Sequence, residues 1–450
     1  MTSRMRIRVF VGIIVLAVSP LWAQVSGPGA EAAATGSGGS GGAMTTPAPV
    51  SGEGYSMGFT SETRSNYLRG GLIFSTAYQT DVTTGSNGQP VNDVSYSIWP
   101  TISLDQTRSR LHWVFTYSPG FTFYQNTSAL NQANQNLGLN LKYRLSPHVT
   151  LSLGDSFQKT SSVLNQPNSD LQQPVSGGVF VPNYSVIAPL ADVLTNTAYA
   201  TLTYQFAANA MVGASGTFGN LYYSNQSQVP GLANSSSKAG SAFYTHRLSK
   251  IHYIGATYQY QAFSASGTGV QSETHAQSIF GFYSIYFKPT ISLSFFGGPQ
   301  YSSTQQLGAP SFQGWSPAGG VSFGWQGKLT SFAASYSQTI NDGGGLSGAV
   351  HASSVNASLH RQLARKLSGG IGAAYANNSV LAASPTFNTA GHTISGNASL
   401  QRQIGEHLNL QLQYTRLHQS YSEVAAISAI PNQNRVAVNI SYQFSRPLGR

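Results

Sequence analysis

Hydrophobic and polar residues alternate along most of the chain, so that each short segment has one apolar and one polar face. The pattern is clearest between Leu111 and Phe123. Its apolar positions are Leu111, Trp113, Phe115, Tyr117, Phe121 and Phe123, and its polar or small positions are His112, Thr116, Ser118, Gly120 and Thr122. Successive side chains of a β-strand point to opposite faces, whereas a helical period would mix the two classes. The segment is therefore predicted to be a two-faced β-strand.

The same alternation recurs toward the C-terminus. It is present in segments 136–143, 149–154, 408–415 and 435–444. Strands of this kind suit a water-soluble sandwich, in which two oily faces meet, or an outer-membrane barrel, in which the oily face meets lipid and the polar face lines the lumen. In segment 277–287 both faces carry aromatic residues, so the pattern does not assign an inside and an outside there.

Short and long connections between the strands follow one another in turn. The short ones are expected at 105–110, 145–148, 207–210, 248–251, 287–290, 325–328, 363–366 and 404–407. The long ones are expected at 81–93, 125–134, 161–193, 224–237, 264–274, 305–315, 341–349, 379–389 and 421–433. Outer-membrane barrels combine tight periplasmic turns with longer outer loops. We therefore predict an all-β fold: a transmembrane antiparallel up-and-down β-barrel over residues 67–446 with about 18 strands, or 16 as the alternative.

The segment 435–444 is predicted to be the closing strand of this barrel and to pair with the strand near Leu72 to Tyr78. Its apolar face should lie against lipid and should also be the signal that the barrel-assembly machinery reads. That face consists of Val436, Val438, Ile440, Tyr442 and Phe444. In such signals the aromatic residue usually ends the chain, whereas here six residues follow Phe444.

Composition favours the barrel over the sandwich. Only 8% of the residues are charged, whereas about a quarter is usual for soluble domains. Beyond the N-terminus there is no apolar run near the roughly 20 residues that a spanning helix needs. A closed barrel is the other structure that satisfies its backbone hydrogen bonds in lipid.

The N-terminus predicts export. Residues 1–23 contain three arginines, a short apolar run and Ala23 before the expected cleavage site, the pattern of a signal peptide. Residues 24–66 are rich in Gly, Ser, Ala and Pro and are expected to form a flexible tail. The sequence contains no cysteine, which excludes disulfides and a lipidated cysteine. The expected location is the bacterial outer membrane.

Charge bears on what passes through the barrel. Residues 67–446 carry 18 Lys and Arg against 10 Asp and Glu, an excess of 18 − 10 = 8. If the lumen shares this excess, it should prefer anions mildly. An exported chain is not expected to meet nucleic acid. The candidate lumen-facing residues are His112, Lys142, Gln411, Gln413 and Asn439.

No motif in the sequence supports an enzyme strongly. Gly320-Val-Ser-Phe-Gly324 matches the G-x-S-x-G pattern of hydrolases, but it lies in an alternating segment without a following helix. The histidines are scattered and no pair has metal-ligand spacing beside carboxylates. We therefore expect no catalytic residue, no cofactor and no metal. A membrane-embedded hydrolase that uses Ser322 or a lumen histidine is the enzymatic alternative.

Two local features lead to further expectations. Pro100 and Pro119 lie inside predicted strands, and a closed barrel has no free edge to accept proline, so a bulge is expected near each. The connection 161–193 is the longest, and it either folds into the lumen and narrows it or lies outside as a lid.

Several fragments resemble a broad family of bacterial β-barrel porins that are often linked to exopolysaccharide secretion. They are Arg69-Gly-Gly-Leu72, Tyr78-Gln-Thr-Asp81, Tyr96-Ser-Ile-Trp-Pro100, Tyr117 to Tyr124 and Tyr143-Arg-Leu-Ser146. The resemblance covers about 67–444 and implies an outer-membrane channel. The expected function is passive passage of small solutes. The alternatives are polysaccharide export and an adhesion or structural barrel.

Overall fold

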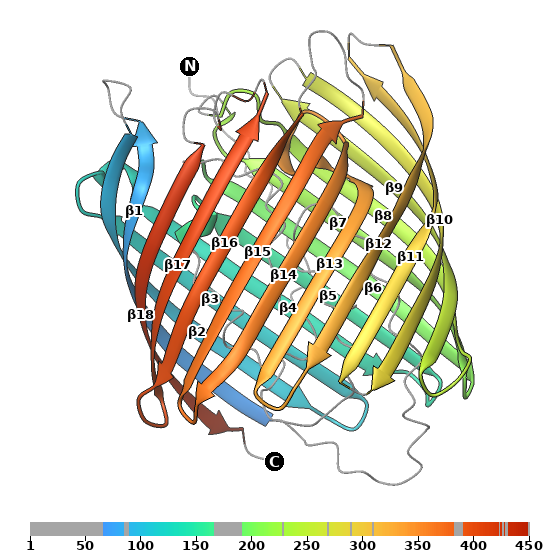
Figure 1. The fold of residues 1–450 in the computed structure, drawn as a ribbon, viewed down its shortest axis with the longest axis horizontal. Coiled ribbons are helices and arrows are strands. Elements are labelled where there is room, and N and C mark those ends of the chain that lie inside the picture. The colour runs from blue at the N-terminus through green and yellow to red at the C-terminus, as the bar shows by residue number, and fades with distance from the viewer. Residues whose placement is uncertain are drawn as a thin grey trace, which may run out of the picture.

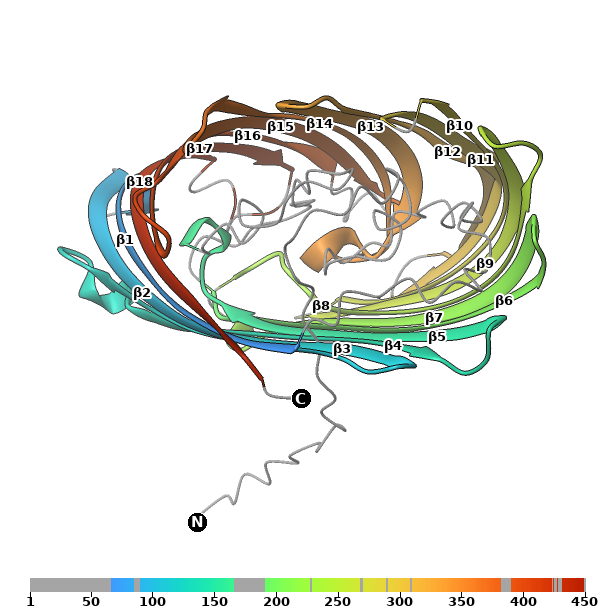
Figure 2. The same cartoon turned by 90° about the horizontal axis from the view of Figure 1, so that it is seen from below.

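The protein forms a single sheet of 18 antiparallel strands that closes on itself (Figures 1 and 2). The structure, a computed structural model, describes residues 66–84, 90–165, 191–226, 229–267, 270–288, 290–307, 310–381, 390–422, 424, 427 and 431–448. The predicted signal peptide and most of the predicted tail lie outside these residues. The strands are β1 (Asn66–Thr84), β2 (Pro90–Thr107), β3 (Leu111–Tyr124), β4 (Gln132–Arg144), β5 (Val149–Thr160), β6 (Val193–Ala207), β7 (Ala210–Tyr223), β8 (Asn234–Arg247), β9 (His252–Gly267), β10 (Val270–Lys288), β11 (Ile291–Gln306), β12 (Phe312–Gln326), β13 (Thr330–Asn341), β14 (Val350–Ala364), β15 (Leu367–Val380), β16 (Ala390–Gln403), β17 (Leu408–Tyr421) and β18 (Asn432–Pro447).

The barrel closes between its first and last strands, as predicted. Each strand pairs with its sequence neighbours, and β18 pairs with β1 in a continuous register that includes Leu72 opposite Tyr442 and Tyr78 opposite Val436. Because the barrel closes, neither β1 nor β18 has a free strand edge there, and a sheet that spans lipid requires this. The predicted fold class and the count of 18 strands are confirmed.

The two faces of the sheet have the predicted chemistry. On β18 the five apolar residues from Val436 to Phe444 are exposed on the outside, whereas Ala437, Asn439 and Ser441 are buried on the inside. On β10, whose pattern is ambiguous, Phe280 and Phe282 point inward and Ile279 and Phe287 point outward. Among the described residues no helix is long and apolar enough to cross a membrane.

The alternation of connections is also confirmed, with corrections to their lengths. The eight predicted short connections join strands at one end of the barrel, and the nine predicted long connections lie at the other end. We call these the tight-turn end and the long-loop end. Several predicted long loops are shorter than expected because the hairpins continue: β1 reaches Thr84, β2 begins at Pro90, β9 reaches Gly267 and β10 begins at Val270.

The bulges predicted at Pro100 and Pro119 are absent. Ile98 pairs with Phe121 and Ile102 pairs with Tyr117, so the register of β2 and β3 is the same on both sides of the prolines. In that register the two prolines lie opposite each other, and the β2–β3 ladder is interrupted only between these pairs. Because the two missing donors fall at one place in the sheet, one short gap accommodates both prolines and no residue is inserted.

The gap lies beside a close contact between Trp99 and Gly120. Trp99 is fully buried on the inside of the barrel, and a Cβ on Gly120 would lie 2.3 Å from its ring. Glycine at position 120 therefore lets the indole lie flat against β3.

We predict that Gly120→Ala lowers the free energy of unfolding by about 1–3 kcal/mol, because the added methyl group must displace Trp99 from a packed site. The matched control is Gly138→Ala on the neighbouring strand β4, where a Cβ would meet nothing closer than 3.8 Å. Urea-induced unfolding in lipid vesicles, followed by tryptophan fluorescence, measures both. Equal stability of the two variants would contradict this account of the glycine.

Candidate functional site: the lumen and its constriction

The candidate site is the space that the sheet encloses. All five residues predicted to face the lumen lie on the interior face of the wall. His112 and Lys142 are register partners on β3 and β4, and the Asn439 amide donates a hydrogen bond to Gln411 across β17 and β18 at 3.2 Å. Gln413 follows on the same face of β17 and is 4% exposed. The structure thus places them in two groups on different parts of the wall.

The half of the lumen next to the tight turns is open along β3, β4 and β12. Interior side chains in this half of those strands are exposed even though they point inward: Thr116, Asn140, Lys142 and Ser322. Interior side chains of β8 to β10 in the same half are buried, among them Thr245, Thr257 and Ser284. Exposed polar side chains on the inner face of a barrel line a space that water can fill.

The charges of this half differ in exposure. Among the described strands, Arg69, Lys142, Arg144 and Arg247 point inward near the tight-turn end, and none of them is buried. The described interior carboxylate of this half is Asp105, which is 0% exposed. Asp93, 2% exposed, and the buried cation Arg435 lie near the long-loop ends of β2 and β18. Asp105 faces His112 at 3.3 Å, and Asp93 accepts hydrogen bonds from Asn126 and Thr127. The open half of the lumen therefore presents positive charge to the solvent.

The half next to the long loops is filled by the chain itself. The connection from Asp342 to Ala349 does not extend into solvent: every residue from Ile340 to Val350 has little or no exposed surface. We call Ile340–Val350 the tip of the β13–β14 hairpin. Its short helix η5 (Gly343–Gly345) lies within the ring of strands when the barrel is viewed along its axis (Figure 2).

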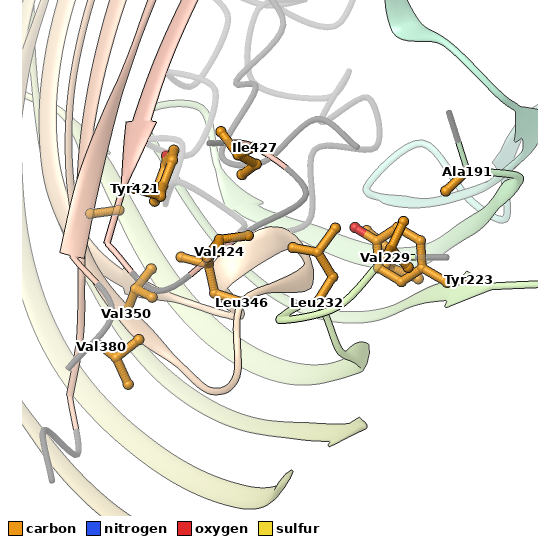
Figure 3. Close-up of a cluster of buried hydrophobic side chains, with 12 residues drawn as sticks. Ala191, Tyr223, Val229, Leu232, Leu346, Val350, Val380, Tyr421, Val424 and Ile427 are labelled. Carbon is orange, nitrogen blue, oxygen red and sulfur yellow. The ribbon is translucent and has the colours of Figure 1, made fainter. Parts of the chain in front are cut away.

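An apolar cluster surrounds the tip inside the barrel (Figure 3). Leu346 of the tip packs in it with residues from opposite parts of the wall and from other long connections. The cluster consists of Ala191, Leu221, Tyr223, Val229, Leu232, Leu346, Val350, Ala352, Val380, Tyr421, Val424 and Ile427. Interiors of channel barrels are mostly polar, so this cluster is a constriction built from apolar side chains.

Hydrogen bonds and glycines hold the tip in this place. The backbone N–H of Ala233 donates to the carbonyl of Gly345 at 2.8 Å, and the N–H of Ile340 donates to the buried Gln300 side chain at 3.2 Å. Gly345 has a φ of +104°, and a Cβ there would lie 2.3 Å from the Tyr223 hydroxyl. Only glycine fits this position without strain.

The sequence did not identify this connection as the constriction. The alternatives considered for 161–193 concern residues that are mostly outside the described part of the chain. Its described beginning does turn inward, because Asn165 is 1% exposed and its amide donates to the Tyr124 hydroxyl at 2.6 Å. A signal for the β13–β14 tip was present in Leu346 and Val350, apolar residues that a solvated loop would not need.

The hydrolase-like segment is part of the wall. Gly320 to Gly324 lies inside β12, where Ser322 pairs with Ser294 on β11 and Ser335 on β13. The strand continues on both sides, so the sharp strand-to-helix turn that exposes a nucleophile is not formed here. Within the described residues, no three His, Asp or Glu side chains are grouped closely enough to hold a metal ion.

When the chain is compared with known proteins, similarity is found only to solved structures. The chain is similar to the ferric citrate transporter FecA in its unliganded form, with 11% identity and a TM-score of 0.41 over 80% of this chain; it spans 60% of the length of FecA. It is similar to Pseudomonas aeruginosa OpdK with vanillate, with 11% identity and a TM-score of 0.39 over 84% of this chain and 99% of that one. It is also similar to Pseudomonas aeruginosa OccK3 (OpdO), with 12% identity and a TM-score of 0.42 over 85% of this chain and 96% of that one.

No protein-family model matches the sequence, and no curated protein matches it. The architecture itself carries the assignment. An even number of antiparallel strands closes into a ring, with an apolar exposed outer face and tight turns confined to one end. This is the construction of a transmembrane β-barrel of the bacterial outer membrane.

Proposed function

We propose that the protein is a porin-like channel for small hydrophilic solutes with a mild preference for anions. The observation that carries this proposal is the asymmetry of charge near the tight turns, where four interior cations keep contact with solvent and the interior carboxylate Asp105 is buried. A lumen lined in this way attracts anions and repels cations by simple electrostatics. The excess of positive charge in residues 67–446 is therefore also found among the exposed interior side chains near the tight turns.

Not all cations near the tight turns can affect ion selectivity. Arg144 and Arg247 belong to the interior face, whereas Arg361 and Arg402 belong to the exterior face, as their register partners show. The exterior pair suits contact with lipid phosphates at the membrane edge. Only the interior ones are expected to affect selectivity.

The test is a swelling assay with liposomes that contain the full chain. We expect small anionic sugars such as gluconate to enter faster than neutral sugars of the same size, and large sugars to be excluded by the constriction. Equal entry of anionic, neutral and cationic solutes would contradict the anion preference. Absence of any swelling would contradict the channel itself.

A second candidate function is export of a polysaccharide, as the family resemblance implies. The observation in its favour is the amide-rich interior of β17 and β18, where Gln411, Gln413, Gln419 and Asn439 lie on one face. Amides can hydrogen-bond to sugar hydroxyls without strong specificity. This function predicts little conductance for the isolated protein and loss of secreted polymer when the gene is deleted.

A further inference from the structure

In the described part of the wall, the pairing between β12 and β13 stops seven residues before β12 reaches its long-loop end. These strands pair from Gln326 opposite Ser331 to Gly319 opposite Gln338, and no pair follows. On its other edge β12 remains paired with β11 as far as Phe312. The ribbons of β12 and β13 run side by side near the tight turns and separate toward the long loops (Figure 1). We call the edge of β12 from Phe312 to Ala318 the seam.

The seam lies at the level of the outer leaflet. Trp325 and Trp315 are both exposed on the outer face of β12. They are ten residues apart, which corresponds to about 25 Å across the membrane for a tilted strand, and aromatic residues mark both interfaces of such barrels. Gly319, where the pairing stops, is near the middle of this distance. The unpaired stretch up to Trp315 therefore faces the outer half of the lipid.

The tip of the β13–β14 hairpin explains why the pairing stops. In the existing register Ala318 would lie opposite Thr339 and Ser316 opposite Asn341, but β13 turns into the lumen instead. There Ile340 and Ala349 pack against Phe263 and Ala276 on β9 and β10, together with Leu381. The tip therefore lies inside the wall, beside the place that its own strand vacates.

The chemistry on the two sides of the seam is apolar. Inside, the tip has the cluster around Leu346 on one side and the cluster around Phe263 on the other. Outside, Trp315 is 72% exposed. An unpaired strand edge within the hydrocarbon region is costly unless it borders protein or a cavity. A seam with apolar surfaces on both sides suits a solute that leaves water for lipid.

We propose that the seam is a lateral passage between the lumen and the outer leaflet for small uncharged apolar solutes. The tip is the gate that closes this passage. Movement of the tip away from β10 opens a path from the apolar interior to lipid without disturbing the rest of the barrel, because β11–β12 and β13–β14 pairing stays intact. This passage is separate from the axial path of small anions and does not depend on it.

An engineered disulfide can test this proposal without competing thiols, because the protein contains no cysteine of its own. A Cβ on Gly348 in the tip would lie 3.5 Å from the Cβ of Ser272 on β10, a separation of about the value that a disulfide requires. The variant Ser272→Cys with Gly348→Cys should therefore tether the tip to the wall when oxidised. The control is Gly219→Cys with Ser237→Cys, a pair of interior positions on the adjacent strands β7 and β8 where the Cβ separation is 3.9 Å.

The probe is N-phenyl-1-naphthylamine, an uncharged apolar dye that fluoresces on entering membranes and that an intact outer membrane excludes. We expect cells that produce the wild-type protein to take it up several times faster than cells without it. Oxidised tethered protein should lose this increase and regain it with a reductant, while the β7–β8 control behaves as wild type. Chloride conductance of the tethered protein in planar bilayers should not change, which separates this passage from the axial one.

A second variant needs no disulfide. Ile340→Asn weakens the apolar contact that holds the tip against β9, so the tip should move away more readily and the dye should enter faster than with the wild type. Dye entry that is no faster with wild-type protein than without it would overturn the proposal. Equal entry of the dye with the oxidised tethered protein and with the wild type would also overturn the proposal, because movement of the tip would then play no part.

Discussion

Removal of the tip of the β13–β14 hairpin raises the single-channel conductance several-fold. In this variant the connection from Asp342 to Ala349 is replaced by Asn-Gly, which suits a two-residue hairpin between the paired residues Asn341 and Val350. The physical reason is that the tip fills the long-loop half of the lumen and supplies Leu346, a fully buried member of the apolar cluster. Without it the narrowest part of the path widens and loses part of its apolar lining. Currents in planar bilayers at a fixed salt concentration measure the effect.

The control for this variant shortens a connection that does not enter the lumen. Helix η1 (Ser128–Leu130) joins β3 and β4 and lies outside the ring of strands (Figure 2). Its deletion should leave the conductance unchanged. If the tip deletion and the η1 deletion have the same conductance, the constriction is not where the structure places it.

Reversal of the interior charge at the tight-turn end changes the selectivity from anions to cations. Lys142→Glu with Arg144→Glu replaces two exposed interior cations on β4 by carboxylates. Charged side chains that line a path in water determine which ion is enriched there. We expect the reversal potential in a KCl gradient to change sign. The effect should be smaller at high salt, because mobile ions screen these charges.

The matched control reverses two cations at the same end but on the other face. Arg361→Glu with Arg402→Glu changes the net charge by the same amount and should leave the reversal potential as it is in the wild type. A similar shift in both double variants would mean that selectivity follows net charge and not the lining of the lumen.

Much of the fold could be predicted from the sequence because it depends on local patterns. Alternation with period two identified the strands, and the order of short and long connections gave both the number of strands and the two ends of the barrel. The closing pair of β1 and β18 followed from an even strand count. In each case the information lies within a few residues of the element it describes.

The features that could not be predicted depend on contacts between distant residues. Asp342-Gly-Gly-Gly345 has the composition of an external turn, and only the presence of Tyr223, Leu232 and Val424 inside the barrel makes it a constriction. The two prolines were expected to force bulges because each was considered alone, whereas the register of β2 and β3 places them opposite each other. The seam between β12 and β13 has no local signal, since both strands alternate normally up to their ends.

The candidate site, too, could be predicted only where it depends on local sequence patterns. The interior position of Lys142 or Gln413 follows from strand periodicity, so the lumen-facing candidates could be found. Their exposure does not follow from it: Lys142 faces open space, whereas Gln413 and Asn439 are largely covered. Which interior charges reach solvent therefore depends on which loops enter the lumen.

The most direct test of the central claim is the zero-current potential of the purified wild-type protein in a planar bilayer that separates two KCl concentrations. The claim is that an open, cation-lined path crosses the barrel and is narrowed at the long-loop end. It predicts discrete channels of small conductance and a zero-current potential displaced toward the equilibrium potential of chloride. A displacement toward the equilibrium potential of potassium, or the absence of channels, would contradict it.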